Sequence, residues 1–325
     1  MFATVQGETE GPRQKNALAV DVSPLGPYSL AVSARGAGDA SRRFRAGELT
    51  APVESENGLE LVRARQRPDG SVTLSASTER GVERLRFQLA LDDDHSAFLQ
   101  RFADDPLLAA SLRNLRGLRP IRLATVAHAL LRALCGQLIT AREARSIEAR
   151  VIHRVSPRDS VSGLYASPTQ ERLAALSPAE LCRLGLAPKR AATLVRLCRT
   201  LDLERLRELP SSAVFARLAR ERTVGPWSIG VLFLEGLGRY DHGLVADLGL
   251  VKLCSVLAGR WVSEAETGEL LARYGEWEGL ASVYLLRGSR QGLVPLGRGA
   301  MDVETGARAL RLHRRQPLPR APSEV

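Results

Sequence analysis

The chain has 325 residues, of which 44% are hydrophobic and 25% are charged. This balance excludes a fibrous or low-complexity protein, and the length allows two or three packed units. The formal net charge of +10 favours a polyanionic partner such as nucleic acid. Since the chain has no long apolar run and no leader pattern, we expect no membrane partner and a cytoplasmic, nucleoid-associated location.

Arginine supplies almost all of the positive charge. The chain has 46 basic residues, and the only lysines are Lys15, Lys189 and Lys252. Guanidinium groups pair well with phosphate, but a genome-wide compositional bias gives the same skew. Charge therefore supports a nucleic-acid partner without proving one.

The cysteines are spaced in a way that argues against a metal site. Cys135, Cys182, Cys198 and Cys254 have apolar neighbours and form no C-x-x-C pair. Such a pattern is typical of buried thiols. The five histidines are scattered, and none stands at metal-ligand spacing from an acid, so no metal is expected.

The first part of the chain alternates apolar and polar residues. We expect disorder over residues 1–16 and an α+β sheet domain over 17–97, because alternation predicts half-buried strands. The expected strands cover residues 29–34, 59–65, 72–77 and 84–91, with a turn at 68–70. They predict an antiparallel sheet with room for a helix over one face.

Helical patterns follow from residue 98 to about residue 290. Each of four capping boxes places a hydroxyl residue three positions before Glu or Gln, at Thr140, Ser167, Ser177 and Ser263. Helices are expected to start near residues 126, 141, 168, 178, 188, 212, 226, 248, 264 and 280. The sequence therefore predicts an all-α core over 98–290, followed by a basic tail over 291–325 with a short helix at 307–313.

Two segments of this core carry the strongest signals for function. The segment from Thr223 to Trp227 reads Thr-Val-Gly-Pro-Trp, a glycine turn that opens directly into an apolar helix. Gly225 can take an open turn conformation, and Pro226 suits a first helical position. Free backbone N–H groups at such a helix start attract phosphate. Twenty residues after Trp227, Asp247 stands among apolar residues, where a carboxylate needs either a chemical role or a capping role.

These segments resemble the helix-hairpin-helix and following aspartate of DNA glycosylases, specifically the DNA-3-methyladenine glycosylase II family. The similar stretch runs from residue 218 to residue 253, and the hairpin is expected over about residues 212–238. Three further segments are similar in the same order, at 92–120, 133–140 and 184–190. The resemblance extends over roughly residues 92 to 286. It implies an α+β protein in which an N-terminal antiparallel sheet precedes an all-α glycosylase core.

The resemblance implies a role for each of several residues. Asp247 would be the essential carboxylate that promotes cleavage of the N-glycosidic bond, although capping of the following helix explains an aspartate there equally well from spacing alone. Trp227, Val231 and Leu286 would line the base pocket, with Trp227 as an aromatic wall.

The same comparison implies the DNA contacts. Gln137 and Leu138 would fill the gap left by a flipped base, with Leu138 as the apolar wedge. The amides of Thr223, Val224 and Gly225 would hold a DNA phosphate, and a monovalent cation at this hairpin is compatible with the family. No other cofactor is expected.

Trp227 also distinguishes between reaction types. Family members that cut the DNA backbone have a lysine at this position as a Schiff-base nucleophile, and Lys252 lies on the following helix instead. The sequence therefore predicts a monofunctional, monomeric enzyme that acts on alkylated purines in double-stranded DNA. Departures from the family at Thr223, Val231 and Glu278 leave two alternatives open: a catalytically weakened damaged-DNA-binding protein, or a glycosylase for a different damaged base.

Overall fold

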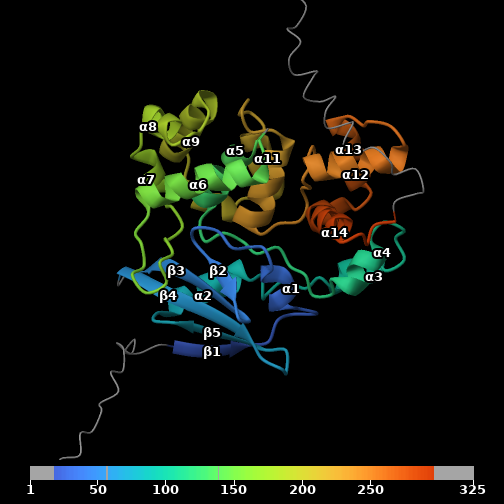
Figure 1. Cartoon of the computed structure of the whole chain (residues 1–325), viewed down its shortest axis with the longest axis horizontal. Coiled ribbons are helices and arrows are strands. Elements are labelled where there is room, and N and C mark those ends of the chain that lie inside the picture. Colours follow the sequence, from blue (N-terminus) through green and yellow to red (C-terminus); the bar gives the residue numbers. More distant parts are fainter. Residues whose placement is uncertain (1–17, 56–57, 138, 296–325) are drawn as a thin grey trace, which may run out of the picture. The chain divides into compact units, whose positions relative to one another are not determined.

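The computed structural model describes residues 18–55, 58–137 and 139–295 (Figure 1). The chain forms two compact units, each assembled from separate segments. The first unit contains the chain up to Ser96, Gly117–Leu209 and Glu235–Gly238; the second contains Ala97–Arg116, Pro210–Leu234 and the chain from Arg239 onward.

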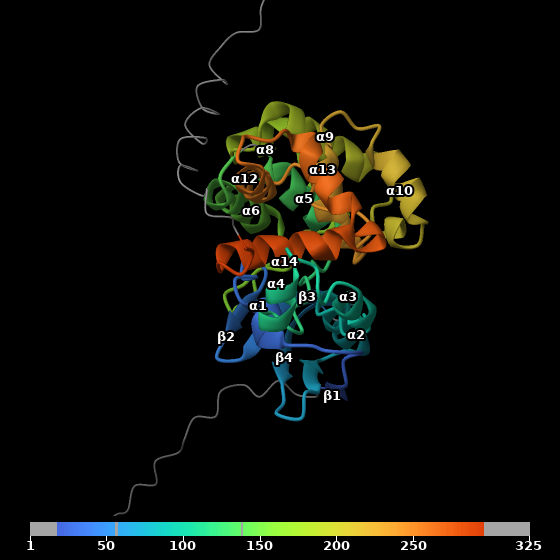
Figure 2. The same cartoon turned by 90° about the vertical axis from the view of Figure 1, so that its right-hand side faces the viewer.

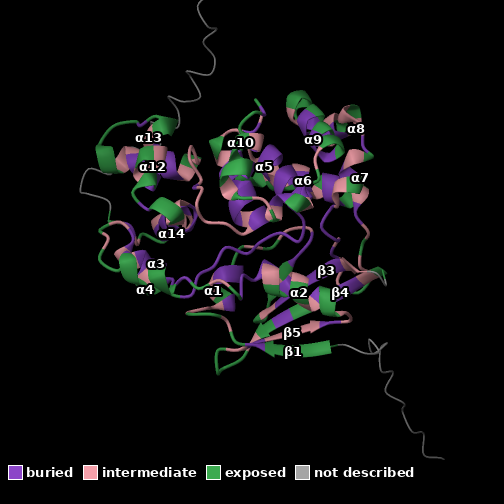
Figure 3. Ribbon diagram, turned by 180° about the vertical axis from the view of Figure 1, so that it is seen from behind, coloured by how far each residue is buried: buried purple, intermediate pink, exposed green. Residues whose placement is uncertain are grey.

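Within the described residues, the first unit contains a five-stranded sheet in the order β1-β5-β4-β3-β2, with every pair antiparallel. The strands are β1 (Leu18–Val22), β2 (Arg43–Arg45), β3 (Glu48–Ser55), β4 (Gly58–Gln66) and β5 (Val72–Ala76). The antiparallel sheet and its strands at 59–65 and 72–77 are thus confirmed. The edge strand β1 is mostly exposed (Figure 3), and the sequence analysis missed β1, β2 and β3.

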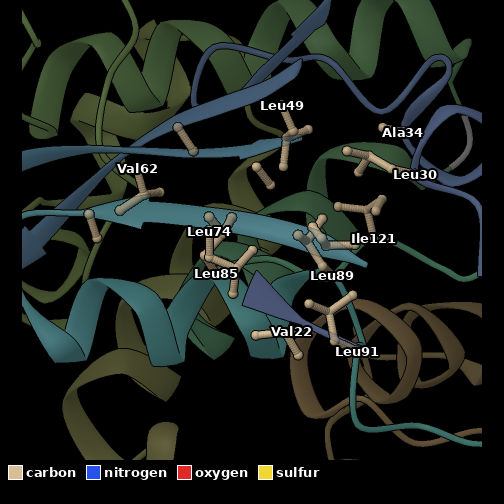
Figure 4. Close-up of a cluster of buried hydrophobic side chains, with 14 of the residues drawn as sticks. Val22, Leu30, Ala34, Leu49, Val62, Leu74, Leu85, Leu89, Leu91 and Ile121 are labelled. Atoms are coloured by element: carbon tan, nitrogen blue, oxygen red, sulfur yellow. The ribbon is translucent and has the colours of Figure 1, made fainter. Parts of the chain in front are cut away.

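Helix α2 (Glu79–Gln88) covers one face of this sheet, as the sequence allowed. Leu85 and Leu89 lie four residues apart on one side of the helix and pack with Leu74 of β5 in a fully buried cluster (Figure 4). Leu30 and Ile121 extend the same core. Burial of each such side chain contributes about 1.5–3 kcal/mol.

Two of the expected strands are wrong, because both segments are helices. Residues 30–34 form α1 (Leu30–Ala34), in which the Ser29 side chain caps the helix by accepting from the Val32 N–H at 3.3 Å. Residues 84–88 belong to α2, which Thr78 caps through the Gly81 N–H at 3.0 Å. Over so few residues, alternating apolar residues also fit a helix with an i, i+4 stripe, and the preceding caps decide for the helix.

The first unit continues with helices, most of which begin where the sequence predicts. They are α5 (Val126–Gly136), α6 (Ala141–Val155), α7 (Gln170–Ala174), α8 (Pro178–Arg183), α9 (Pro188–Thr200) and the 3₁₀ turn η1 (Glu204–Arg207). The capping boxes at Thr140 and Ser177 are confirmed. The box at Ser167 is wrong: Thr169 caps α7, and the Ser167 hydroxyl lies 3.1 Å from Nδ1 of His128.

The second unit is helical throughout its described part. It contains most of α3 (Ser96–Arg101), α4 (Ala109–Asn114), α10 (Ser211–Leu218), α11 (Pro226–Val231), α12 (Leu248–Ala258), α13 (Glu264–Ala272), the 3₁₀ turn η3 (Gly275–Trp277) and α14 (Glu278–Arg290). Helices α12 and α13 lie on the same side of α14 in both views (Figures 1 and 2). The capping box at Ser263 is confirmed. The π-helix η2 (Leu232–Leu237) continues from α11, and the chain passes between the units within it.

Most of the two predicted terminal segments, 1–16 and 291–325, lies outside the described residues, as does the helix expected at 307–313. The predicted boundaries of the sheet domain and of the helical core stay predictions. In the described part of the chain, no helix is both long enough and apolar enough to cross a bilayer.

Candidate active site

The predicted hairpin forms between α10 and α11 without a left-handed residue at its glycine. Gly225 has φ −81° and ψ 177° and stands at the N-cap of α11. Thr223 is not among the described non-glycine residues with positive φ, so threonine is accommodated there without strain. The Val224 amide donates to the carbonyl oxygen of Glu221 at 2.8 Å, and the Ile229 amide donates to Gly225 at 3.0 Å. The Val224 amide is therefore already used inside the turn.

Packing does not require a glycine at position 225. A methyl group built on its Cα would have no heavy atom of the described protein within 4 Å. Its amide donates to no described residue. Glycine allows a ligand to approach the backbone closely, and an unused amide at a helix start suits an anion. Within the hairpin, Gly225 is therefore the residue best placed to contact a phosphate.

Asp247 is both the N-cap of α12 and the centre of a hydrogen-bonded group. Its Oδ1 atom accepts from the Gly249 amide at 2.8 Å, and its Oδ2 atom accepts from the Trp227 indole Nε1 at 2.9 Å. The capping role weighed in the sequence analysis is therefore real. Both carboxylate oxygens keep further lone pairs, so the cap leaves the side chain able to accept from a third group.

The predicted pocket residues differ in how close they lie to this carboxylate. Trp227 is half-buried and bonded to Asp247. Leu286 of α14 lies beside it, since a methyl group on Gly249 would be 2.6 Å from Cδ2 of Leu286 and 3.0 Å from Oδ1 of Asp247. Val231 is only 5% exposed. The structure thus brings Trp227, Leu286 and Asp247 together, whereas Val231 packs in the interior of the unit.

Two cavities are lined by other residues. One, of about 280 Å³ in the second unit, is lined by Ser211, Arg239, Tyr240, Asp241, Glu276 and Trp277. The other, of about 350 Å³, belongs to the first unit and lies next to Arg84, Gln170 and Glu204. Asp247 lines neither of them. Neither Trp227 nor Leu286 lines them either.

The segment that carries Asp247 has an unusual backbone. Ala246 has φ 67°, a left-handed conformation that costs a residue with a Cβ roughly 1–2 kcal/mol. Its amide donates to Oγ1 of Thr267 at 2.8 Å, and the Leu244 amide donates to Oγ of Ser282 at 3.0 Å. Burial raises the pKa of the Glu278 carboxyl, and the Gly243 amide partly offsets that rise. The sequence analysis missed Thr267 and Ser282; the signal available was a hydroxyl residue inside an otherwise apolar helix face.

Gln137, predicted to lie beside the wedge, belongs to the first unit. It is the C-cap of α5, half-buried, and α6 begins four residues later at a complete capping box. The break between the two helices is therefore confirmed. Leu138 lies outside the described residues, so its role as a wedge stays a prediction.

A buried ionic network joins α5 to α6 below this break. Nε2 of His128 lies 2.8 Å from Oε1 of Glu148, and Nε of Arg132 donates to the same oxygen at 2.9 Å. Arg132 also binds Glu235 at 2.6 Å and forms an ion pair with Asp39. Removal of one partner from such a pair costs about 3–5 kcal/mol. The network therefore ties α5 to α6, the two helices on either side of the predicted wedge.

Two carboxylates of this network have lowered pKa values despite burial. Burial acts to raise the pKa of Asp39, but the guanidinium groups of Arg42 and Arg132 hold that pKa well below its usual range. The pKa of Glu148 is likewise lowered, because Arg132 and His128 outweigh burial. Among the residues that the structure describes, no group of three or more His, Cys, Asp or Glu side chains forms a metal site.

No family model matches the chain. A curated relative, the DNA-3-methyladenine glycosylase of Bacillus subtilis (strain 168), is 25% identical over 206 residues, which are 61% of this chain and 68% of the relative. An identity of 25% is too low to transfer individual residue roles.

Solved structures match a larger share of the chain. A 3-methyladenine DNA glycosylase from Archaeoglobus fulgidus matches 84% of this chain and 98% of its own, with a TM-score of 0.72 and 19% identity. The 8-oxoguanine glycosylase/lyase of Clostridium acetobutylicum in complex with DNA matches 85% and 99%, with a TM-score of 0.68 and 16% identity. These likenesses establish the fold. Together with the curated relative, they confirm the resemblance to DNA-3-methyladenine glycosylases that was read from the sequence.

Proposed function

We propose that the protein is a monofunctional DNA glycosylase of the DNA-3-methyladenine glycosylase II type, which hydrolyses the N-glycosidic bond of alkylated purines in base excision repair. The observation that carries this proposal is the position of Asp247: its two oxygens accept from Gly249 and Trp227, and Leu286 lies beside it. The curated relative, a DNA-3-methyladenine glycosylase, supports the same reaction, and the similar glycosylase structure in complex with DNA supports DNA as the partner.

The proposed reaction needs little more than a fixed negative charge. An alkylated purine carries positive charge and leaves readily, so the sugar develops oxocarbenium character as the bond breaks. A carboxylate held by two N–H donors can stabilise that charge and orient the attacking water. Asp247 would act in this way, while the indole face of Trp227 stacks on the cationic base.

DNA would be bound from two places in the fold. The Gly225 amide, which has no described acceptor, would contact a phosphate, and the hairpin is the site where a monovalent cation would sit if one binds. Gln137 and Leu138 would fill the gap after the base is flipped out. The reaction would take place in an all-α core over residues 98–290 that follows the N-terminal sheet domain; the element order from β1–β5 to α3–α14 supports this organisation.

The decisive experiment compares base release by wild type and by Asp247→Asn on methylated duplex DNA. Asparagine is as good a helix cap as aspartate, so the variant should fold normally and bind DNA with an abasic analogue. We expect release of 3-methyladenine to fall by at least about a hundredfold, the scale seen when one electrostatic stabiliser is lost. Asp241→Asn, on the loop before α12, is the matched control and should keep full activity.

The same assay separates the alternatives. If wild type and Asp247→Asn both bind damaged DNA and neither releases any base, the protein is a damaged-DNA-binding protein. A panel of alkylated and deaminated bases tests a different substrate. Trapping with borohydride should give no covalent protein–DNA adduct, because Trp227 stands where a lyase needs a lysine nucleophile.

A further inference from the structure

The turn that carries Asp247 is held by buried hydroxyl groups from two other helices. Leu244 and Asp247 close this turn, since the Asp247 amide donates to the carbonyl oxygen of Leu244 at 3.0 Å. Between them, Ala246 is held in its left-handed conformation. Such a conformation persists only where the surroundings fix it, and these often lie at functional sites.

Thr267 of α13 supplies one of the two contacts. Its side chain has no exposed surface, and its Oγ1 atom accepts from the Ala246 amide at 2.8 Å. Its own hydroxyl proton is donated to the carbonyl oxygen of Glu264 at 2.5 Å. Because that proton is committed within α13, the hydroxyl can present only a lone pair to the turn.

Ser282 of α14 repeats the same arrangement on the other side of the turn. It too has no exposed surface, and its Oγ atom accepts from the Leu244 amide at 3.0 Å while donating to the carbonyl oxygen of Glu278 at 2.7 Å. Two helices therefore each provide one oriented acceptor to the residues next to Asp247. A valine or alanine in place of either would leave a turn amide without its acceptor.

We propose that Thr267 and Ser282 are positioning residues for the proposed glycosylase reaction: they fix the turn so that the Asp247 carboxylate meets the Trp227 indole and the reacting sugar. This inference rests on the proposed function for its kinetic part. The inference also accounts for the left-handed conformation of Ala246, because the turn sets the direction in which the Asp247 side chain leaves the backbone.

The test compares Thr267→Val, which keeps the shape and loses the acceptor, with Thr267→Ser, which restores it. We expect kcat to fall between about tenfold and a hundredfold in Thr267→Val with KM nearly unchanged, because small misplacements of a reacting group have effects of this size. Thr267→Ser should recover to within about threefold of wild type. Ser282→Ala should behave like Thr267→Val, and it keeps the test possible if one variant fails to fold.

Ser255 provides a matched control in the same unit. Its Oγ atom accepts from the Val262 amide at 3.1 Å and donates to the carbonyl oxygen of Val251 at 2.7 Å. Ser255 therefore makes the same two kinds of hydrogen bond, but the amide that it fixes is that of Val262 and does not belong to the turn before Asp247. Ser255→Ala should lose as much thermal stability as Ser282→Ala but should leave kcat unchanged.

A second readout does not depend on activity. The chain has three tryptophans, so its indole N–H groups give three resolvable signals in a ¹⁵N-correlated NMR spectrum, and Trp227→Phe assigns the one bonded to Asp247. Thr267→Val should shift that signal, and Ser255→Ala should not. If wild type releases no base but the shift occurs, the proposed function fails and the positioning role stands. If the signal and kcat are unchanged in Thr267→Val, or change equally in Ser255→Ala, the positioning role is overturned.

Discussion

The Trp227 indole N–H donates to Oδ2 of Asp247 at 2.9 Å, which joins the first turn of α11 to the N-cap of α12. The two residues are twenty positions apart, and each was singled out from the sequence for a different reason. Their contact ties the position of the carboxylate to that of the indole. A shift of the hairpin would therefore move the carboxylate as well.

Trp227→Phe tests this link. Phenylalanine keeps an aromatic face but has no N–H, and a hydrogen bond to a charged group contributes about 1.5–3 kcal/mol. We expect the single-turnover rate of base release to fall by roughly tenfold or more. Trp277→Phe, in the separate aromatic cluster with Phe98, is the control, and an equal loss there would show that the indole bond has no specific role.

Substitution by alanine should affect stability at one glycine of the hairpin region and DNA binding at another. A methyl group on Gly230 would stand 2.2 Å from the carbonyl oxygen of Gly243, whereas Gly225 has open space. Gly230→Ala should lower the free energy of unfolding by about 1–3 kcal/mol, measured by urea titration. Gly225→Ala should stay within about 0.5 kcal/mol of wild type and yet bind duplex DNA more weakly. Unchanged DNA affinity would remove Gly225 from the proposed phosphate contact.

The buried His95 should make the protein less stable in mild acid. Burial, helped by the guanidinium groups of Arg119 and Arg122, lowers the pKa of His95 to about 3. The unfolded chain takes up a proton below about pH 6.5 and the folded chain does not. The free energy of unfolding should therefore fall as pH decreases from 6.5 toward 3, by at most about 1.4 kcal/mol per pH unit from this group.

Urea titrations at several values between pH 7 and pH 4.5 measure this slope. His95→Gln should flatten it, whatever its effect on stability at pH 7. His153→Gln, at an exposed position on α6, should leave it as in wild type. A slope that is the same in all three proteins would assign the acid sensitivity to other groups.

The cysteines should differ sharply in reactivity. Burial raises the pKa of Cys198 to about 12 and also raises the pKa of Cys135 and Cys254. Since the thiolate is the reactive form, these three should react with a thiol reagent only as the protein unfolds. Cys182 is half-buried and should react first. Mass spectrometry after brief labelling at pH 7.5 identifies the site, and rapid labelling of Cys135 would contradict the buried-thiol interpretation.

The helical part of the fold was accessible from the sequence because its signals are local. A cap needs only a hydroxyl residue and a glutamate three positions later, and Thr140, Ser177 and Ser263 satisfy this within one turn. Pro226 likewise marks the first residue of α11. Such contacts do not depend on the rest of the chain, so the pattern alone predicts them.

Elements that depend on distant partners were harder to predict. Residues 30–34 alternate like a strand, but the Ser29 cap starts a helix there, and Leu30 and Ala34 bury one stripe of that helix in the core of the sheet. The short strand β2 exists only through its pairing with β3. Tertiary context overrides a weak local pattern in both cases.

The candidate site, like the fold, was predictable only in part. Its residues could be named from motif and resemblance, but its geometry could not. Nothing in the sequence indicates that Ala246 is left-handed or that Thr267 accepts its amide, because both depend on the packing of α13 against a turn twenty residues earlier. Glycine is the usual marker of such a backbone, and here alanine replaces it.

The chain passes from the second unit to the first within η2, so the two units cannot be separated by one cut. Leu234 ends one segment of the second unit and Glu235 begins a segment of the first, in the middle of a continuous helical stretch. Neither unit is a single length of polypeptide, so no one proteolytic cut or gene truncation releases either of them whole.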